Sequence, residues 1–277
     1  MKEFDEYKRL SEPGKKEKSE IWDVAVGLQQ VDGLTPSDYL IETAKRNIEG
    51  EITILEVKER LDDHYKARPL TKGDRTEEAD KVSARTVEIL SEKAFTFSPA
   101  EYMTIHKRLF EGIYGHAGKI RDYNISKAEW VLNGETVSYA SADSIKAALD
   151  YDFSQEKSYE YKGLGKKEIV GHIAKFVSGL WQIHAFGEGN TRTTAVFAIK
   201  YLRTLGFDAA NDTFADNSRY FRNALVRANH NDYKKGIFST TEYLDRFFGN
   251  MLLGEKNVLK NREMLVNAAT GTLKTIL

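Results

Sequence analysis

Residues 166–206 read KKEIVGHIAKFVSGLWQIHAFGEGNTRTTAVFAIKYLRTLG, two apolar stretches separated by the nine residues HAFGEGNTR (184–192). In the first stretch, Ile169, Ile173, Phe176 and Leu180 recur at helical spacing and give a broad apolar face. That pattern predicts a central, largely buried helix. The second stretch is equally apolar and closes at a glycine, the usual residue after a helix. The polar loop is therefore expected between the two most buried helices.

The rest of the 277 residues supports an all-α fold. There are only four prolines, and long segments carry apolar residues at helical spacing. With 41% hydrophobic and 30% charged residues, the composition is that of a soluble globular protein. The net charge of −1 gives no reason to expect nucleic acid or an anionic membrane as a partner. The absence of cysteine excludes disulfides and thiolate metal sites.

The chain divides into four parts. Residues 1–20 are rich in lysine and glutamate, lack the apolar region of a secretory signal, and are expected to be flexible. Residues 21–66 carry helical patterns that end at a polar joint containing proline and glycine. Residues 75–253 form the main domain, and residues 254–277 are expected to be a helical tail. No stretch is apolar enough to cross a bilayer, so a cytoplasmic location is expected.

One segment interrupts the helical pattern. Residues 129–139 have β-forming residues on both sides of an Asn-Gly pair, which tolerates the positive φ angles of a type I′ turn. The sequence therefore predicts a β-hairpin. A lone hairpin in a helical protein is expected to be a functional flap rather than a core element. The flap residues expected to dock a target are Trp130, Val131, Leu132, Asn133 and Gly134.

The loop residues suit chemistry on a phosphate ester. The N-terminus of the second helix offers free N–H groups and a positive dipole end, which bind phosphate. Gly187 and Gly189 let the backbone approach a ligand closely, and Arg192 supplies a planar fork for phosphate oxygens. Glu188 is a carboxylate suited to Mg²⁺ bound together with substrate phosphates. His184 can accept a proton near neutral pH.

Each of these residues alone also has an ordinary structural explanation. A histidine at a helix end is usually a capping or core residue, and Glu188 and Arg192 could form a surface ion pair. The combination carries the argument, because six specified residues in nine rarely coincide by chance.

The loop matches, at every specified position, the signature His-x-Phe-x-(Asp/Glu)-Gly-Asn-x-Arg of the Fic family. Residues 117–121 and the flap resemble that family's flap region, and residues 220–225 resemble a helix of its nucleotide pocket. The resemblance implies a Fic-type helical core in which His184 is the catalytic base and Glu188 holds Mg²⁺. The implied nucleotide-binding residues are Gly187, Gly189, Asn190, Thr191, Arg192 and Asn223.

Two positions depart from the pattern of the family's adenylylating members. Thr191 stands where a glycine is usual, and Ala195 stands where a second arginine normally meets the outer phosphates of ATP. The resemblance therefore leaves the preferred nucleotide open.

Residues 21–66 resemble the small VbhA-like antitoxins that accompany some Fic toxins, here fused to the front of the chain. Those antitoxins carry (Ser/Thr)-x-x-x-Glu-Gly, whose glutamate pairs with the second arginine and blocks productive ATP binding. This chain has Leu28 and Asp32 at the two specified positions, followed by Gly33. Asp32 and Gly33 are the candidate inhibitory residues, with Arg192 as a conceivable partner. The alternative is that residues 21–66 are now a packed helical subdomain without an inhibitory role.

The leading functional hypothesis is a protein adenylyltransferase that transfers AMP from ATP, with Mg²⁺, to a Ser, Thr or Tyr hydroxyl of a target protein or of itself. The flap would pair with the target by strand addition. The alternatives are transfer of another nucleotide or of a phosphate group, and a degenerate nucleotide-binding interaction module. The expected partner is a protein with a hydroxyl side chain, without nucleic acid or membrane, and a homo-oligomer stays open.

Overall fold

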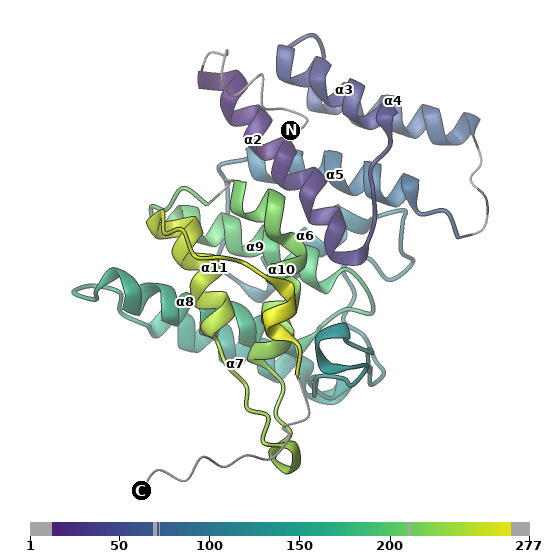
Figure 1. Ribbon diagram of the computed structural model, residues 1–277. Helices are drawn as coiled ribbons and strands as arrows, with labels where there is room; N and C mark the ends of the chain where they lie inside the picture. Colours follow the sequence, from purple (N-terminus) through teal and green to yellow (C-terminus); the bar gives the residue numbers. More distant parts are fainter. Residues whose placement is uncertain (1–12, 69–70, 72, 210–211, 267–277) are drawn as a thin grey trace, which may run out of the picture.

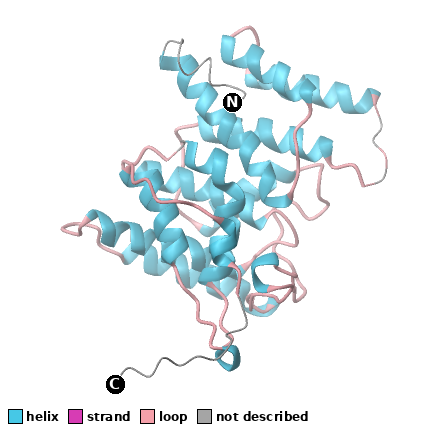
Figure 2. Cartoon of the chain, viewed as in Figure 1, coloured by secondary structure: helices cyan, strands magenta, loops and turns pink. Residues whose placement is uncertain are grey.

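The computed structural model describes residues 13–68, 71, 73–209 and 212–266, and Figure 2 shows helices and loops but no strand in these ranges. This all-α architecture confirms the fold class expected from the sequence. The α-helices are α2 (Pro13–Gly27), α3 (Asp38–Glu49), α4 (Ile54–Ala67), α5 (Thr76–Ser91), α6 (Pro99–Phe110), α7 (Ile145–Ser158), α8 (Lys166–Ile183), α9 (Asn190–Thr204), α10 (Asp212–Ala228) and α11 (Glu242–Leu253). The 3₁₀ helices are η1 (Leu28–Asp32), η2 (Trp130–Leu132), η3 (Ala142–Ser144), η4 (Tyr233–Lys235) and η5 (Asn261–Met264).

Local capping explains several helix boundaries. Ser98 precedes α6, and its side chain accepts a hydrogen bond from the backbone N–H of Glu101, with Pro99 in the first turn. Thr53 and Glu56 form a reciprocal capping box at the start of α4. Gly50 ends α3 at φ 82°, a left-handed conformation that costs glycine little. The ends expected at Ser98 and Gly50 are confirmed.

The buried centre of the molecule is built on α8 and α9. Helix α8 packs against α7, α9, α10 and α11, and α9 packs against α5, α6 and the 3₁₀ turn η1. Every residue of α9 from Asn190 to Leu202 is buried. The prediction of two buried helices on either side of the loop is therefore confirmed.

The N-terminal segment packs directly onto this core. Helix α2, purple in Figure 1, lies against α5 and α10, and α3 and α4 form a neighbouring antiparallel pair. Trp22 is fully buried, and its indole Nε1 donates a hydrogen bond of 3.0 Å to the side chain of Asn47. The expectation that residues 1–20 are flexible is wrong for residues 13–20, which belong to α2. The reason is that Ser19 is also buried, so the packed face begins before Ile21.

A buried carboxylate ties this segment to the main domain. Asp80 of α5 accepts hydrogen bonds from the backbone N–H of Ser37 at 2.8 Å and from its hydroxyl at 2.5 Å. The hydroxyl of Tyr65 donates a third at 2.6 Å. These contacts hold α3 and α4 against α5 on either side of the polar joint at 66–74.

The predicted β-hairpin at residues 129–139 is wrong. The chain does turn at Asn133 (φ 54°) and Gly134 (φ 90°), as the Asn-Gly pair predicts. However, Val131 and Leu132 are both fully buried, and consecutive residues of a strand point to opposite faces. A 3₁₀ turn can direct both side chains inward, and η2 does so. We keep the name flap for residues 129–139.

The predicted helical tail at 254–277 is largely wrong for the residues that the structure describes. Between Gly254 and Val266 the only helical element is the four-residue turn η5, and the remainder of the tail lies outside the described residues. Met264 in this turn is buried, so the segment is anchored without being an α-helix.

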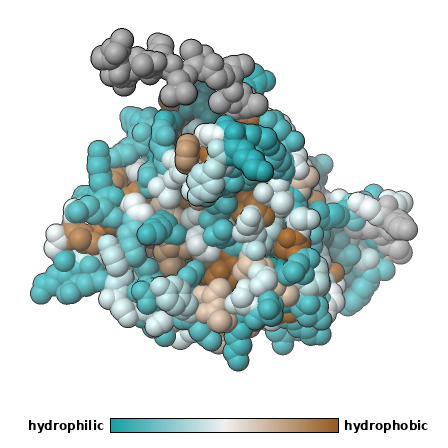
Figure 3. Space-filling view, turned by 90° about the horizontal axis from the view of Figure 1, so that it is seen from below, coloured by the Kyte–Doolittle hydropathy of each residue, from teal (hydrophilic) through white to brown (hydrophobic). Residues whose placement is uncertain are grey.

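The outer surface is mixed. On the face seen in Figure 3, apolar residues lie interspersed among polar ones, as on ordinary protein surfaces. Among the described residues, no helix has the length and apolar character required to span a membrane.

Candidate active site

His184 ends α8 in the left-handed conformation, with φ 50° and ψ 56°. Its backbone N–H donates to the carbonyl of Trp181 at 3.0 Å, which closes the helix. Arg121 holds the next stretch: its Nε donates to the carbonyl of His184 at 2.8 Å, and its backbone N–H donates to the carbonyl of Ala185 at 2.9 Å. Arg121 is buried, so these bonds fix the direction in which the loop leaves α8.

Asn190 closes the loop on itself. Its Oδ1 accepts the backbone N–H of Phe186 at 3.0 Å, and its Nδ2 donates to the carbonyl of Phe186 at 2.7 Å. The ring of Phe186 is fully buried and stacks on His106 with ring centroids 3.7 Å apart. Both polar atoms of the Asn190 side chain are therefore used within the loop and fix its shape.

His106, on α6, ties the loop to a neighbouring turn. Its Nε2 lies 3.0 Å from the carbonyl of Glu188, and its Nδ1 accepts the backbone N–H of Gly118 at 2.8 Å. A carbonyl can only accept, so Nε2 carries the proton. Burial lowers the pKa of His106 to about 4, which keeps the ring neutral. The sequence reasoning gave His106 no role, although it follows Ile105 on the inward side of α6.

The ring of His184 is buried, with 3% of the residue exposed, and neither ring nitrogen has a hydrogen-bond partner in the described structure. Its neighbours are Tyr139, at a centroid distance of 4.1 Å, and Trp181, at 5.4 Å edge-on. Burial, together with the positive charges of Lys127 and Arg222, lowers the pKa of His184 well below its ordinary value. The imidazole is therefore neutral near pH 7 and has a free lone pair.

Packing requires a glycine at position 189. A Cβ on Gly189, which sits at φ 76°, would lie 2.4 Å from the ring of the buried Phe110. A Cβ on Gly187 would lie 2.6 Å from the hydroxyl oxygen of Tyr123, but this is the end of an exposed side chain that can move. Next to them, the hydroxyl of Thr191 accepts the indole N–H of Trp181 at 3.0 Å, so this threonine joins α9 to α8.

Glu188 is the exposed acid of the loop. About half of its side chain is exposed (52%), and Lys127 donates to its carboxylate at 2.9 Å. Among the described residues there is no cluster of three metal-binding side chains. A divalent cation could fit here only through this one carboxylate together with ligand phosphates, which is the usual coordination of Mg²⁺ on a nucleotide.

Arg192, in the first turn of α9, is almost completely buried, with 1% of its side chain exposed. Its guanidinium lies 2.9 Å from the carboxylate of Asp32 and donates to the side-chain oxygen of Gln29 at 3.0 Å. Both partners belong to η1 in the N-terminal segment. The contact between Asp32 and Arg192 that the sequence suggested is therefore present in the structure.

A second acid reaches the same guanidinium from the main domain. Glu78 of α5 accepts from Arg192 at 2.6 Å, and the hydroxyl of Tyr114 lies 3.2 Å from the same nitrogen. Burial alone would raise the pKa of Glu78, but hydrogen bonds from Arg75 and the charge of Arg192 lower it to about 2. Sequence reasoning missed Glu78, which is 114 positions away from Arg192.

A pocket of about 360 Å³ is lined by residues from three parts of the predicted site: the candidate inhibitory turn, the flap and Asn223. It lies between the N-terminal turn that carries Asp32 and Gly33, the flap, and helix α10. Asn223 lines it, with its amide bonded to the side chain of Asn261 at 2.6 Å. Its other lining residues include Gln30, Glu129, Trp130, Arg219 and Arg222.

The flap is partly covered by the C-terminal segment. The carbonyl of Val131 accepts the backbone N–H of Val266 at 2.9 Å, and the amide of Asn133 donates to the carbonyl of Val266 at 2.6 Å. Trp130 remains 55% exposed. The structure therefore leaves Trp130 and the Gly134 turn open, while Val131 and Leu132 are buried.

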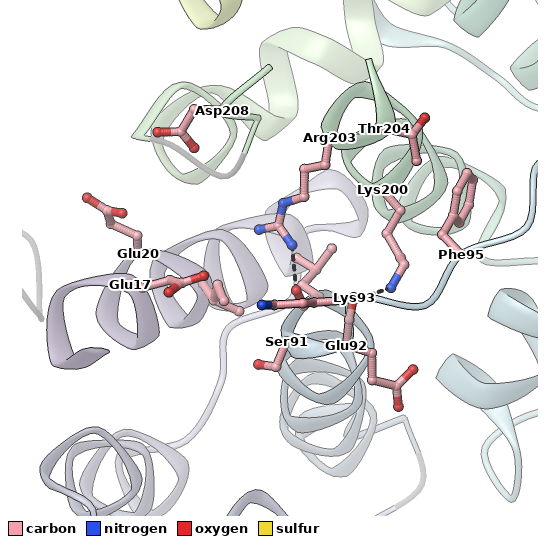
Figure 4. Close-up of a pocket in the computed structure, with 12 residues that line it drawn as sticks. Glu17, Glu20, Ser91, Glu92, Lys93, Phe95, Lys200, Arg203, Thr204 and Asp208 are labelled. Atoms are coloured by element: carbon pink, nitrogen blue, oxygen red, sulfur yellow. Dashed lines mark hydrogen bonds between the residues drawn. The ribbon is translucent and has the colours of Figure 1, made fainter. Parts of the chain in front are cut away.

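A further pocket lies between α2, α5 and α9 and contains none of the loop residues (Figure 4). There, Lys200 donates to the carbonyls of Ile89 and Glu92, and Arg203 donates to the carbonyl of Leu90. These cations satisfy the free carbonyls at the end of α5, so their role is to cap a helix.

The fold places a glycine-containing loop between two central, buried helices, α8 and α9. Residues 96–202 match the model of the Fic/DOC family. Over 129 residues, 47% of its length, the chain is 28% identical to "Protein adenylyltransferase VbhT" of Bartonella schoenbuchensis. The match spans about a quarter (24%) of that relative's length.

Two solved structures are also similar. BepC from Bartonella tribocorum, with bound AMPPNP, has 18% identity and a TM-score of 0.49, over 70% of this chain and 86% of that one. The type IV secretion system effector protein BepA has 19% identity and a TM-score of 0.48, over 63% of this chain and 60% of that one.

Proposed function

We propose that this protein is an adenylyltransferase that transfers AMP from ATP to the hydroxyl of a Ser, Thr or Tyr side chain on a protein. The observation that carries the proposal is the buried, neutral and unpartnered ring of His184 at the mouth of the Fic loop. Buried polar atoms without partners are rare and costly, and they are frequently functional. The relationship to an adenylyltransferase over the loop region supports the same choice.

In the proposed reaction, His184 accepts the proton of the target hydroxyl. The hydroxyl oxygen forms a bond to the α-phosphorus of ATP, and the bond from that phosphorus to the bridging oxygen breaks, which releases pyrophosphate. Catalysis of this kind depends mainly on positioning and on neutralising charge. The rigid loop held by Arg121 and Asn190 provides the positioning.

Glu188 is the residue that would hold Mg²⁺, which would offset the negative charge of the phosphates. In the structure, the ammonium group of Lys127 forms an ion pair with this carboxylate. A nucleotide with its cation must therefore displace the lysine or recruit it to a phosphate.

The nucleotide is proposed to lie between the first turn of α9 and the pocket that Asn223 lines. Gly187, Gly189 and Thr191 are the proposed backbone contacts to the phosphates along the first part of this path. Because Ala195 provides no guanidinium for the outer phosphates, transfer of another nucleotide or of a phosphate group is the second candidate. The third is a nucleotide-binding interaction module without turnover.

The N-terminal segment, residues 21–66, is proposed to inhibit the enzyme as a fused antitoxin. Asp32 and Gln29 contact the guanidinium of Arg192 and, together with Glu78, would compete with phosphate for it. The competing hypothesis is that the segment only packs. Deleting the segment is a poor test because it would strip Trp22, Leu28 and the rest of that buried face from α5 and α10. Point substitutions at Asp32 avoid this.

The remaining parts of the proposal concern partners and location. A target segment would dock against the exposed part of the flap at Trp130 and Gly134, and self-modification is included. A cytoplasmic location and a toxin–antitoxin role are proposed. Whether the chain forms a homo-oligomer stays open.

The test is a panel of labelled nucleotides. ATP labelled at the α-phosphate should leave label on protein in the presence of Mg²⁺, whereas ATP labelled at the γ-phosphate should not. Retention of γ-label would favour phosphate transfer. Retention from CTP, GTP or UTP but not ATP would favour another nucleotide, and binding without any retention would favour the interaction module.

A further inference from the structure

The orientation of His184 needs an explanation, because nothing hydrogen-bonds its ring. In many hydrolases the base histidine is oriented by an acceptor on its second nitrogen. Here both nitrogens lack a partner in the described structure. The ring is in contact with two aromatic side chains, Tyr139 from the flap and Trp181 from the preceding turn of α8.

The side chain of Tyr139 is itself held in place by two contacts. Its ring packs edge-on against Trp181 at 5.7 Å, and its hydroxyl donates to the carboxylate of Glu129 at 3.3 Å. Glu129 is 3% exposed, and both of its oxygens accept from the guanidinium of Arg222 at 2.9 Å. Burial raises the pKa of Tyr139, so the phenol keeps its proton and remains a donor.

The residues that hold Tyr139 border the proposed nucleotide pocket. Glu129 and Arg222 both line this pocket, together with Asp32 and Asn223. The flap, α10 and the end of α8 are therefore joined through one chain of contacts that ends at the ring of His184.

We propose that Tyr139 is a positioning residue that holds the imidazole of His184 in its productive orientation, with Glu129 and Arg222 as its anchor. The proposal deepens the proposed function, since it explains how that reaction's base is aimed. The flat ring at 4.1 Å restricts rotation of the imidazole and excludes water from one face. The ring contacts His184 and Trp181 directly, whereas the hydroxyl contributes through a single hydrogen bond of 3.3 Å to Glu129, so the ring carries most of the effect.

The test compares Tyr139→Leu, which removes the ring, with Tyr139→Phe, which removes only the hydroxyl. The matched control is Tyr151→Leu on α7, where the tyrosine is 64% exposed. All variants carry Asp32→Asn, so that inhibition by the N-terminal segment does not mask activity. Misplacing a reacting group by about 1 Å can cost about 100-fold in rate. We expect Tyr139→Leu to lower kcat for AMP transfer about 10- to 100-fold with less than a twofold change in KM for ATP.

Tyr139→Phe is expected to stay within about threefold of the parent, a difference of less than 1 kcal/mol in activation free energy. Equal losses for the leucine and phenylalanine variants would overturn the proposal, as would an unchanged kcat for the leucine variant. A loss expressed only in KM would also overturn it, because it would place Tyr139 in nucleotide binding.

A second measurement does not depend on the reaction. The imidazole protons of His184 should show a ring-current shift in NMR spectra that persists in Tyr139→Phe and shrinks in Tyr139→Leu to the contribution of Trp181. The acid limb of the pH-rate profile and the titration midpoint of His184 in NMR spectra should also shift. Lys127, Arg121 and Arg222 face His184 and disfavour its charge, and removing the ring adds water that favours it. The acid limb for Tyr139→Leu should therefore lie at higher pH.

If no nucleotide gives transfer, the proposed function fails, and the NMR comparison still decides whether Tyr139 orients the ring. Unchanged His184 resonances in Tyr139→Leu would overturn the positioning role whatever the activity.

Discussion

The carboxylate of Asp32 lies 2.9 Å from the guanidinium of Arg192 and joins the N-terminal segment to the first turn of α9. Arg192 also contacts Glu78 at 2.6 Å, so two acids from different parts of the chain share one buried cation. A phosphate that approaches this arginine must compete with both. This relationship leads to the first prediction.

Asp32→Asn should strengthen ATP binding about 10-fold and raise self-labelling. Removing one charged competitor frees part of the guanidinium, and a tenfold change corresponds to about 1.4 kcal/mol. Glu78 remains in place, so release should be partial, and adding Glu78→Gln should increase it further. Calorimetric titration with ATP and Mg²⁺ measures the affinity.

The control for this change is Asp38→Asn, in the exposed first turn of α3 of the same segment. It should leave ATP affinity unchanged. Equal affinities for wild type, Asp32→Asn and the Asp32→Asn/Glu78→Gln protein would show that the N-terminal segment only packs.

Acid should destabilise the fold in a specific pH window. His106 and His184 both have a pKa below the ordinary 6.5 because they are buried. Below pH 6.5 the unfolded chain binds protons that the folded chain does not, so the free energy of unfolding falls as pH falls. Each such histidine contributes a slope of about 1.4 kcal/mol per pH unit.

Urea denaturation at pH 7.5, 6 and 5 checks this. The series stays above the pH range where Glu78, with a pKa of about 2, would be protonated. His106→Gln should be less stable than wild type at pH 7.5 but should have a shallower pH dependence, by about one histidine. An identical slope in both proteins would contradict the assignment of His106 as a buried neutral ring.

Gly189→Ala should be much more damaging than Gly206→Ala, although the two glycines flank the same helix, α9. Both have positive φ, at 76° and 85°, which costs alanine about 1 kcal/mol. Only at Gly189 would the new methyl group strike another side chain, the ring of Phe110. Overpacking of this kind adds about 1–3 kcal/mol. Thermal or urea unfolding should separate the variants, and equal losses would contradict the close packing of the loop on α6.

Lys127→Gln should lower the Mg²⁺ concentration required for half-maximal activity several-fold, because it removes a cation that competes for Glu188. Glu188→Gln should raise that concentration or abolish activity. Lys119→Gln, on the exposed turn near the loop, serves as the control. A Mg²⁺ requirement that is the same in Lys127→Gln and wild type would remove Glu188 from the proposed metal site.

Local sequence patterns predicted most of the helices. The apolar residues of α8 and α9 recur at helical spacing over several turns. Ser98 and Gly50 mark helix ends, because the backbone groups that they cap lie only a few residues away. The loop was also predictable, because the residues that specify it stand within nine consecutive positions, 184–192.

The errors arose where tertiary contacts override local preference. The β-formers around Asn133 suggested strands, but Val131 and Leu132 are both needed in the core, which favours a 3₁₀ turn. The start of α2 was missed because its lysines and glutamates conceal a buried face that includes Ser19.

The residues of the candidate site also divide into those that the local sequence predicts and those that only tertiary contacts bring in. His184, Glu188 and Arg192 could be named from the motif, whereas Glu78 and Tyr139 could not. Their contacts with Arg192 and His184 exist only after distant segments come together, and no spacing rule connects them.

His184 is proposed to be the base of an AMP-transfer reaction. The most direct measurement incubates the Asp32→Asn protein with α-labelled ATP and Mg²⁺, alongside the Asp32→Asn/His184→Ala protein, and follows covalent label on denatured protein. We expect label on the first protein and none on the second. Equal label on both, or none on either with any target or nucleotide tried, would contradict this proposal.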